Sequence, residues 1–263
     1  MPEGDTVHLA ARKLDAALSG YALTRTDFRV PRVATADLAG QTVLETVARG
    51  KHLLTRTDGG VSLHTHFRMD GSWRLYRPGA RWRGPAHEVR AVLETGSWVA
   101  VGHRLGIVEL VRTEAEDAVV GHLGPDVLGP DWDPDLAAAN LAREPDRAIG
   151  EALVDQRLLA GPGNVYKSEA LFLRGVHPWM PAGRVDLPAL VGLVKRLMEA
   201  NRETGRQVTT GDPRRGRGRW VYARGGDACR RCGTPIRQGM QGDAPEERVT
   251  YWCPGCQPEA SEA

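Results

Sequence analysis

Residues 155–169, DQRLLAGPGNVYKSE, form the junction that decides the fold of the second half of the chain. Two glycines around Pro162 make a tight turn, and Asn164 then opens a helix. The Asn164 amide and the unsatisfied backbone N–H groups of the first helical turn point the same way, which creates a site for a phosphate. An ordinary N-cap asparagine at a helical hairpin accounts for the same residues, and the spacing leaves both interpretations open.

Helical patterns lie on both sides of this turn. Asp133-Pro134 and Asp146 are helix-start signals. Helices are expected over 134–142, 147–157, 164–174 and 187–203. Before them, the sequence GPDVLGP at 124–130 is a turn-rich connector. The second half therefore begins as a helical domain, and the sequence predicts a domain boundary at this connector.

The first half alternates short apolar runs with Gly, Pro and Asp turn signals. Val89, Ala91 and Leu93 alternate strictly, as in a strand with one buried face. The runs are 42–48, 53–55, 61–66, 72–76, 88–94, 97–101 and 107–111. They predict a β-sandwich or barrel. A helix capped by Asp5 and stopped by Gly20 precedes it; its apolar positions are Val7, Ala11, Leu14 and Leu18.

All four cysteines lie near the C-terminus, and twenty residues separate the pair Cys229 and Cys232 from the pair Cys253 and Cys256. In a chain without a secretory signal, this spacing predicts a four-cysteine zinc site with tetrahedral thiolate ligands. Disulfides are disfavoured in a reducing compartment, and four thiolates leave no open position for a catalytic metal. We expect one structural Zn2+ per chain, in a small hairpin that contains Arg248.

The chain begins Met1-Pro2-Glu3-Gly4, and a proline in second position can become an unusual amino terminus. Removal of Met1 would leave Pro2 as a free secondary amine. An α-amino group titrates near about 8, so a nucleophilic fraction exists at neutral pH and can form an iminium. Glu3 is an adjacent carboxylate able to act as general acid or base. The alternative is that this proline has no catalytic role, as in most chains that begin Met-Pro.

Lys51 interrupts an apolar pattern within Arg49–His52. It could reach the same pocket as Pro2 or bind a phosphate, although a lone lysine between strands is usually solvated surface. The turn 66–71 carries Met69, which is either core filler or a wedge that enters a base stack. The turn 102–106 again sets a basic group beside an apolar one.

The 263 residues, of which 41% are hydrophobic, favour two globular domains. No apolar run approaches the roughly 20 residues needed to cross a bilayer, and the start lacks a signal-peptide pattern. We therefore expect a soluble, cytoplasmic protein without a membrane partner. The net charge of +2 predicts no nucleic-acid partner by itself. The distribution of charge does predict a nucleic-acid partner, because residues 205–237 contain nine Arg, no Lys and two Asp, a local charge of +7.

Together these residues resemble the formamidopyrimidine-DNA glycosylase and endonuclease VIII family. Four collinear motifs between residues 2 and 257 carry the resemblance: Pro2-Glu3-Gly4, Arg49-Gly50-Lys51, the Gly161–Glu169 turn, and the four-cysteine finger with Arg248 five residues before its third cysteine. The resemblance implies an α+β fold, with an N-terminal β-sandwich and flanking helix, then a helix-two-turn-helix domain with a zinc finger. It also implies a bifunctional DNA glycosylase and AP lyase of base excision repair that acts on oxidised bases.

The resemblance implies domain limits as well. The catalytic sandwich would cover 1–124, a linker 125–133, the helix-two-turn-helix domain 134–222, the finger 223–257 and a disordered tail 258–263. The expected partner is double-stranded DNA with damaged bases or abasic sites, with single-stranded DNA as a further one. The protein would be a monomer associated with the nucleoid.

Residue by residue, Pro2 resembles the family's Schiff-base nucleophile and Glu3 its proton-transfer partner. Lys51 resembles the motif lysine at the lesion phosphates. Asn164 and Arg248 resemble the phosphate ligands of the turn and of the finger. Such contacts give affinity that does not depend on sequence, as a lesion scanner requires.

Met69 matches the residue that fills the void left by a flipped nucleotide. Arg68 beside it, and His103 and Leu105 in the second turn, are expected to contact DNA. Flipping a base costs a few kcal/mol of stacking, which an inserted side chain and clustered phosphate contacts can offset.

Departures from the family pattern indicate a branch. Arg157 and Leu105 stand where the purine-excising branch has a lysine and a phenylalanine, and no long base-capping loop is evident around 209–212. Thr6 stands where the endonuclease VIII start has a third acidic residue. The sequence looks most like the actinobacterial endonuclease VIII-like branch. Oxidised pyrimidines are the expected substrates, because they stack and pair poorly and a pocket without a long capping loop has few groups to hold a purine.

Two alternatives remain open from the sequence. One is a zinc protein that binds damaged DNA without chemistry, which Pro2 and Glu3 argue against. The other is a purine-excising glycosylase of the formamidopyrimidine type.

Overall fold

The computed structural model describes residues 2–244 and 247–259. The chain divides into two compact units, one up to His122 and one from Leu123 onwards, and each is described by itself. Met1, whose removal would expose the Pro2 amine, and residues 260–263 of the predicted tail lie outside the described residues.

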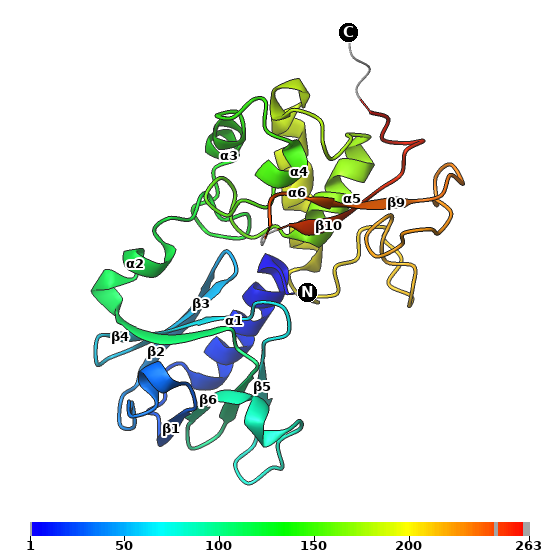
Figure 1. The fold of residues 1–263 in the computed structure, drawn as a ribbon. Helices are drawn as coiled ribbons and strands as arrows, with labels where there is room; N and C mark the ends of the chain where they lie inside the picture. The colour runs from blue at the N-terminus through cyan, green and yellow to red at the C-terminus, as the bar shows by residue number, and fades with distance from the viewer. Residues whose placement is uncertain (1, 245–246, 260–263) are drawn as a thin grey trace. The chain divides into compact units, whose positions relative to one another are not determined.

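In residues 2–122, eight strands form two four-stranded antiparallel sheets (Figure 1). The first sheet has the order β2 (Val43–Arg49), β3 (His52–Thr57), β4 (Val61–His66) and β8 (Ile107–Arg112). The second has the order β1 (Arg25–Phe28), β6 (Val89–Glu94), β7 (Val99–His103) and β5 (Ser72–Tyr76). The helices are α1 (Gly4–Leu18) and α2 (Asp117–Val120), with 3-10 turns η1 (Pro31–Val33), η2 (Ala86–Glu88) and η3 (Thr113–Ala115).

One apolar core joins the two sheets and α1, as expected for a β-sandwich in which alternate residues of each strand face inward. Leu63 on β4 and Leu93 on β6 are each 1% exposed, and α1 adds Leu14 at 1%. On the opposite side of β6 and β7, Val92 and Val101 belong to a separate buried cluster. The second sheet is therefore buried on both faces.

The structure corrects three predicted elements of this unit. A further strand, β1, forms over Arg25–Phe28, where the sequence shows no apolar alternation, because β6 offers it a complete antiparallel partner. Glu3, not Asp5, is the N-cap of α1, and Asp5 lies buried in the first turn. The run predicted over 97–101 forms a strand only from Val99, because Trp98 closes a turn by accepting a hydrogen bond from the Thr95 N–H (2.8 Å).

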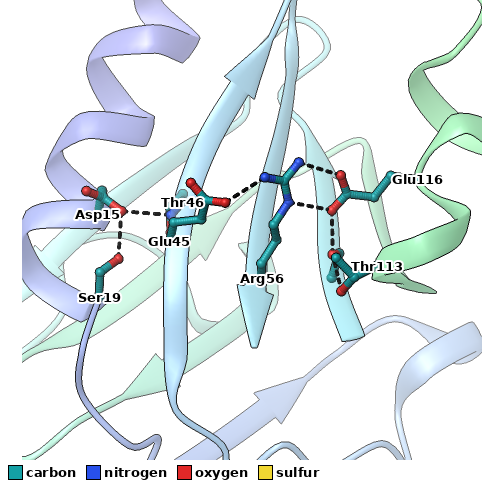
Figure 2. Close-up of polar contacts among 8 residues, drawn as sticks. Asp15, Ser19, Glu45, Thr46, Arg56, Thr113 and Glu116 are labelled. Carbon is teal, nitrogen blue, oxygen red and sulfur yellow. Dashed lines mark hydrogen bonds and ion pairs between the residues drawn. The ribbon is translucent and has the colours of Figure 1, made fainter. Parts of the chain in front are cut away.

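A partly buried ion pair ties β3 to the segment that follows β8 (Figure 2). Arg56 donates two hydrogen bonds to Glu116, of 2.9 and 2.6 Å, and a third to Glu45 on β2, of 2.6 Å. Burial alone would raise the pKa of Glu116, but hydrogen bonds from Arg56 and Ser62 lower it overall. The carboxylate therefore stays ionised and holds the end of the sheet.

Asp15 attaches α1 to the first sheet. Its carboxylate accepts hydrogen bonds from the Ser19 hydroxyl (2.6 Å) and from the backbone N–H of Thr46 on β2 (2.8 Å), as Figure 2 shows. The helix that begins the chain is thus fixed to the sheet by a polar contact as well as by its apolar face.

The second unit is helical and ends in a hairpin. Its elements are α3 (Pro134–Leu141), α4 (Ile149–Ala152), α5 (Asn164–Arg174), η4 (Ala182–Arg184), α6 (Leu187–Asn201), β9 (Arg237–Gln241) and β10 (Arg248–Trp252). Helix α6 packs against α3 and α5, and α5 also packs against β10 (Figure 1). As predicted, Asp133 caps α3, and its carboxylate accepts from the N–H groups of Asp135 and Leu136.

The helix predicted over 147–157 is confined to Ile149–Ala152. The Asp155 carboxylate accepts a hydrogen bond from the backbone N–H of Arg157 (3.1 Å), a local turn that competes with helix formation. The helix predicted to reach residue 203 ends at Asn201, whose side chain binds both the N–H and the carbonyl of Val208. Side chains that fold back onto the backbone set both ends.

Helix α5 is the buried centre of this unit, because every residue from Asn164 to Phe172 is buried. It ends at Gly175, whose φ of 68° is the left-handed conformation that favours glycine at this position. Four of its buried residues, Asn164, Lys167, Ser168 and Glu169, are polar. Their partners determine what surrounds the helix.

Among the described residues, no helix combines the length and the apolar character needed to cross a membrane.

Candidate functional site

Pro2 and Glu3 lie immediately before α1. Pro2 is half-buried, whereas the Glu3 side chain is fully buried at the N-cap position. The Glu3 carbonyl accepts a hydrogen bond from the Val7 N–H (3.1 Å), which begins the helix. The positive end of the helix dipole favours a negative charge here. The start of α1 therefore holds a carboxylate beside the residue that would carry the amine.

Lys51 lies in the two-residue turn between β2 and β3. Gly50 takes a φ of 58° in the first position of this turn, and Arg49 pairs with His52 across it. Helix α1 packs against both strands. The hairpin thus presents Lys51 at the end of strands that also support the helix of Pro2 and Glu3.

A directed hydrogen-bond chain supports this hairpin. His64 Nδ1 lies 2.8 Å from Glu109 Oε1, and His64 Nε2 lies 2.8 Å from His52 Nδ1. A carboxylate, here also paired with Arg32 at 3.1 Å, only accepts hydrogen bonds. His64 therefore carries its proton on Nδ1, and His52 donates from Nδ1 to His64. The tautomers of His64 and His52 are thus both set by the Glu109 carboxylate at the end of the chain of hydrogen bonds.

His66 completes the group and was not singled out from the sequence. Its Nδ1 accepts a hydrogen bond from the Arg68 N–H (2.9 Å), which leaves the proton on Nε2 as a donor. Burial lowers the pKa of His52 to about 3 and that of His66 to about 4, with Lys51 and neighbouring histidines adding to both shifts. Both rings are neutral at neutral pH, so Lys51 is the charged member of this group.

The turns after β4 and β7 lie side by side. The Gly106 N–H donates to the His66 carbonyl (2.9 Å), and a Cβ on Gly106 would lie 2.1 Å from Cγ of Arg68, so only glycine fits. Met69 is 57% exposed, which makes it a surface side chain and not core filler. Arg68 and Arg104 have φ values of 52° and 49°, a strained conformation typical of functional turns.

The second turn differs from the sequence expectation. Leu105 is only 5% exposed and packs in the sandwich core, and His103 is 3% exposed at the end of β7. As the turn stands, neither side chain is exposed on it, and His103 instead lines a small cavity. Arg104 is the residue that reaches solvent, paired with Glu88. Contact between Leu105 and DNA would require the turn to change conformation.

In the second unit, one hydrogen bond brings Asn164 and Arg248 together. Asn164 Nδ2 donates to the carbonyl of Val249 on β10 (2.7 Å), the residue after Arg248. Gly163 is the N-cap of α5, so the interpretation of Asn164 as an ordinary cap is wrong. The asparagine instead fixes the hairpin strand against the start of the helix.

A groove of about 700 Å³ lies beside this contact, lined by Arg147, Arg157 and Arg248 among others. Arg157 and Arg147 both bind Asp155, at 2.7 and 3.0 Å, and their hydrogen bonds lower the pKa of that carboxyl to about 2. Arg248 is exposed. The groove therefore carries fixed guanidinium groups of the kind that bind phosphates.

Two buried polar side chains of α5 hold the segments around the groove. Lys167 Nζ donates to the Thr250 hydroxyl on β10 (2.6 Å). Glu169 accepts from the backbone N–H groups of Trp220, Val221 and Tyr222, at 2.7, 2.8 and 2.8 Å. Its carboxylate thus organises the arginine-rich segment that precedes the finger.

The four cysteines meet at the open end of the β9–β10 hairpin. Cys229 and Cys232 precede β9, Cys253 and Cys256 follow β10, and their sulfur atoms all lie within 4.8 Å of one another. Two of the S–S separations are 3.4 and 3.9 Å. Tetrahedral thiolates at about 2.3 Å from a zinc ion would be roughly 3.8 Å apart. The cluster is able to bind a metal, and the cysteines are not disulfide-bonded.

The predicted residues thus divide between the units. The first holds Pro2, Glu3, Lys51, Arg68, Met69, His103 and Leu105, and the second holds Asn164, Arg248, Cys229, Cys232, Cys253 and Cys256. Within each unit the structure also shows residues that the sequence did not single out: His66, Arg104, Asp155, Lys167 and Glu169. For His66 the sequence did offer a signal. His64 and His66 are two residues apart in a predicted strand, and residues two apart share a strand face.

Comparison with protein families identifies both halves. Residues 1–105 match the formamidopyrimidine-DNA glycosylase N-terminal domain, and residues 123–210 match the formamidopyrimidine-DNA glycosylase H2TH domain. A probable endonuclease 8 2 of Streptomyces coelicolor is 57% identical, covering 98% of this chain and 94% of the relative. The DNA-(apurinic or apyrimidinic site) lyase Nei2 of Mycolicibacterium smegmatis is 48% identical, covering 98% and 99%.

The fold agrees with solved structures. A Lactococcus lactis formamidopyrimidine DNA glycosylase bound non-covalently to DNA with an AP site has a TM-score of 0.81 at 23% identity, covering 98% of this chain and all of the other. The chain belongs to the formamidopyrimidine-DNA glycosylase and endonuclease VIII family. It is an enzyme of the DNA glycosylase and AP lyase class, and its full-length relatives place it with the actinobacterial endonuclease 8 2 proteins. The resemblance and the α+β fold expected from the sequence are confirmed.

Proposed function

We propose that the protein excises oxidised bases from DNA in base excision repair, with pyrimidines favoured, and then cleaves the strand at the resulting abasic site. The observation that carries the proposal is the start of the chain, where Pro2 precedes a helix capped by the fully buried carboxylate of Glu3. The full-length identity of 48% to a DNA-(apurinic or apyrimidinic site) lyase supports it.

The chemistry follows from a secondary amine beside a carboxylic acid. With Met1 removed, the Pro2 nitrogen attacks C1′, the bond from C1′ to the damaged base breaks, and Glu3 donates a proton to the sugar ring oxygen as the ring opens. The product is an iminium between Pro2 and C1′. Loss of the 3′ phosphate by β-elimination and of the 5′ phosphate by δ-elimination leaves a gap with phosphates at both ends.

The remaining residues bind the strand. We assign contacts with phosphates to Lys51, Asn164 and Arg248, and add the Nε2–H donor of His66 beside Lys51. Met69, exposed on its strained turn, would fill the space left by the flipped nucleotide. Arg68 lies next to it, whereas Leu105 is buried and would contribute only through a rearranged turn.

The cysteine cluster fits one structural Zn2+. Its four sulfur atoms lie within 4.8 Å of one another, and four thiolate ligands would leave no coordination position for a substrate. The metal would hold the hairpin that carries Arg248. We propose that the working form is a monomer bound to damaged duplex DNA, with single-stranded DNA as a further partner, at the nucleoid.

Trapping with borohydride tests the mechanism. Incubation of the protein with abasic-site DNA should give a covalent adduct through the Pro2 nitrogen, because reduction converts the iminium into a stable amine. Pro2→Gly should weaken trapping, and a protein that retains Met1 should form no adduct. The intact mass of the protein shows which form is present. An adduct mapped to Lys51 instead would overturn the assignment.

Single-turnover rates test the substrate range. Oxidised pyrimidines stack and pair poorly, so their extrusion costs less, and the buried Leu105 offers no aromatic face to the opposite base. Duplexes with thymine glycol or 5-hydroxyuracil should be processed faster than duplexes with 8-oxoguanine opposite cytosine. The reverse order would assign the chain to purine excision.

A further inference from the structure

An arginine-rich loop covers the outer face of the second sheet. It joins β5 to β6 and contains Arg77, Arg81 and Arg83, and Arg74 projects from β5 next to it. All four are exposed, and none forms an ion pair within the described part of the chain. Unpaired cations on one surface attract polyanions.

The loop is fixed to the sheet by specific contacts. The Arg83 N–H donates to the Tyr76 hydroxyl (3.1 Å), and Arg74 donates to the Arg83 carbonyl (3.1 Å). Arg77 stacks on Trp98, 3.8 Å from the ring centroid. The loop therefore presents its cations from a defined position.

Beneath the loop lies a cavity of about 280 Å³, lined by Ala80, Trp82, Gly84, Ala86, Val89 and His103. Trp82 is half-buried and packs against the valine cluster of β6 and β7. His103 is 3% exposed, and within the described residues neither of its ring nitrogens has a hydrogen-bond partner. A buried polar group without a partner is uncommon and marks a site that a ligand or water can satisfy.

The one acidic side chain close to His103 is already occupied. Glu88, which follows the loop, is bound to Arg104. The residues that line the cavity thus include an aromatic ring and a buried imidazole and no carboxylate, and Arg81 and Arg83 lie in the same loop. These groups suit a ligand that is flat, has hydrogen-bonding edges and carries negative charge beside it.

We propose that this cavity binds an unpaired nucleobase of a single DNA strand, stacked on Trp82 and hydrogen-bonded at His103, with Arg81 and Arg83 on the flanking phosphates. The volume is just below the roughly 300–1,000 Å³ of sites for drug-sized ligands, which suits one ring system. Aromatic platforms in cationic surroundings are the usual means of holding single strands, and every base has a face that can stack. The contact lies outside the residues assigned to catalysis.

Fluorescence anisotropy with undamaged oligothymidylate tests the stacking contact. Trp82→Leu keeps apolar packing but removes the flat ring, and should weaken binding about fivefold or more. Trp82→Phe retains a ring and should keep most of the affinity, so it tests the proposal even if the leucine variant folds poorly. Unchanged affinity in a folded Trp82→Leu protein, or equal loss in both variants, would overturn the proposal.

The salt dependence tests the phosphate contacts. Arg81→Ala combined with Arg83→Ala should lower the slope of log K against log salt by about 1.4, or roughly 0.7 for each lost contact with a single strand. Arg112→Ala is the matched control, because Arg112 is an exposed arginine of the same unit paired with Glu114. An unchanged slope in the double variant would remove the arginines from the site.

Three further ligands test whether the cavity is specific for a single strand. An undamaged blunt duplex has no unpaired base, so wild type and Trp82→Leu should bind it equally. A loss of affinity for the duplex as large as that for the single strand would contradict the proposal.

Free thymidine monophosphate should quench tryptophan fluorescence less than oligothymidylate does, and equal quenching would assign the cavity to free nucleotides. Polyglutamate that competes as well as oligothymidylate would indicate an acidic protein instead. None of these assays uses borohydride trapping, so failure here is distinct from failure of the proposed catalysis.

Discussion

The β-sandwich and the four-cysteine finger are stabilised by different means. The sandwich has one apolar core that joins both sheets and α1. The buried cluster at the finger is small: its members are Phe172, Val221, Cys229, Ile236 and Cys253, and two of these are thiols of the predicted metal site. A hairpin of this size obtains too little free energy from such a core to fold alone. Apolar pattern therefore specifies the first unit, whereas the end of the second combines a small core, the neighbouring helix α5 and a cysteine cluster able to bind a metal.

The two units also differ in the hydrogen-bond partners of a buried carboxylate. Glu116 of the first unit, in the segment after β8, is paired with the guanidinium of Arg56 on β3. Glu169 in the second is satisfied by three backbone N–H groups of one segment. The first arrangement joins two elements that already have regular structure. The second gives a defined conformation to residues that form neither helix nor strand.

Loss of a metal ligand should have the largest effect and should be confined to the finger. Metal binding supplies on the order of 10 kcal/mol to small zinc domains, so Cys232→Ser should unfold the finger while the sandwich keeps its thermal transition. Metal analysis should find one zinc per wild-type chain, and hydrogen exchange should show protection lost in the finger alone. Cys232→His, which retains a zinc ligand, is the matched control. A fully active protein without metal would refute a structural role.

Glu169→Gln should have the second-largest effect on stability. Glutamine retains one acceptor oxygen, but its NH2 group would face backbone N–H donors. Hydrogen bonds to a charged group contribute about 1.5–3 kcal/mol each, so we expect a loss of about 3 kcal/mol in the free energy of unfolding. Urea denaturation measures it, and amide exchange at Trp220, Val221 and Tyr222 should accelerate. Glu199→Gln, at an exposed glutamate of α6, is the control. Unchanged exchange at the three amides would show that Glu169 does not order this segment.

Each of the two partly buried histidines of the sandwich should make a smaller, pH-dependent contribution. The folded pKa values of about 3 for His52 and about 4 for His66 lie below the ordinary 6.5, so the unfolded chain binds protons first as pH falls. Stability is therefore full above pH 6.5 and decreases towards pH 4, by about 2 kcal/mol per histidine between pH 7 and 5. Thermal melting against pH measures this. His66→Gln should reduce the dependence, whereas the exposed His87→Gln should leave it unchanged. Equal slopes in all three proteins would contradict the assignment.

Local patterns predicted the elements that form for local reasons. Asp133-Pro134 begins α3 as expected, and alternation located most strands of the sandwich. One failure has a tertiary cause, because Arg25–Phe28 becomes a strand where β6 is available to pair with it. The other rests on side-chain contacts that the apolar pattern does not record. Residues 153–157 leave the predicted helix because Asp155 binds the backbone N–H of Arg157 and the guanidinium groups of Arg147 and Arg157.

The candidate site shows the same division. The order of the motifs along the chain was enough to indicate the family, because Pro2, Lys51, Asn164 and the cysteine spacing are properties of the sequence itself. The hydrogen-bond partners of those residues could not be predicted from the sequence. That Asn164 binds the carbonyl beside Arg248, 85 positions away in the chain, depends on β10 packing against α5.

The sequence by itself therefore determined the family and the α+β architecture and supplied the candidate site residues, since these depend on residue type and spacing. Only the tertiary structure decided which of the groups are exposed. Leu105 is buried and Met69 is not, although both occupy turns of similar composition. The physical reason is that burial and hydrogen-bond partners arise from segments distant in the chain, and no local pattern of charge or hydrophobicity records which segments will pack together.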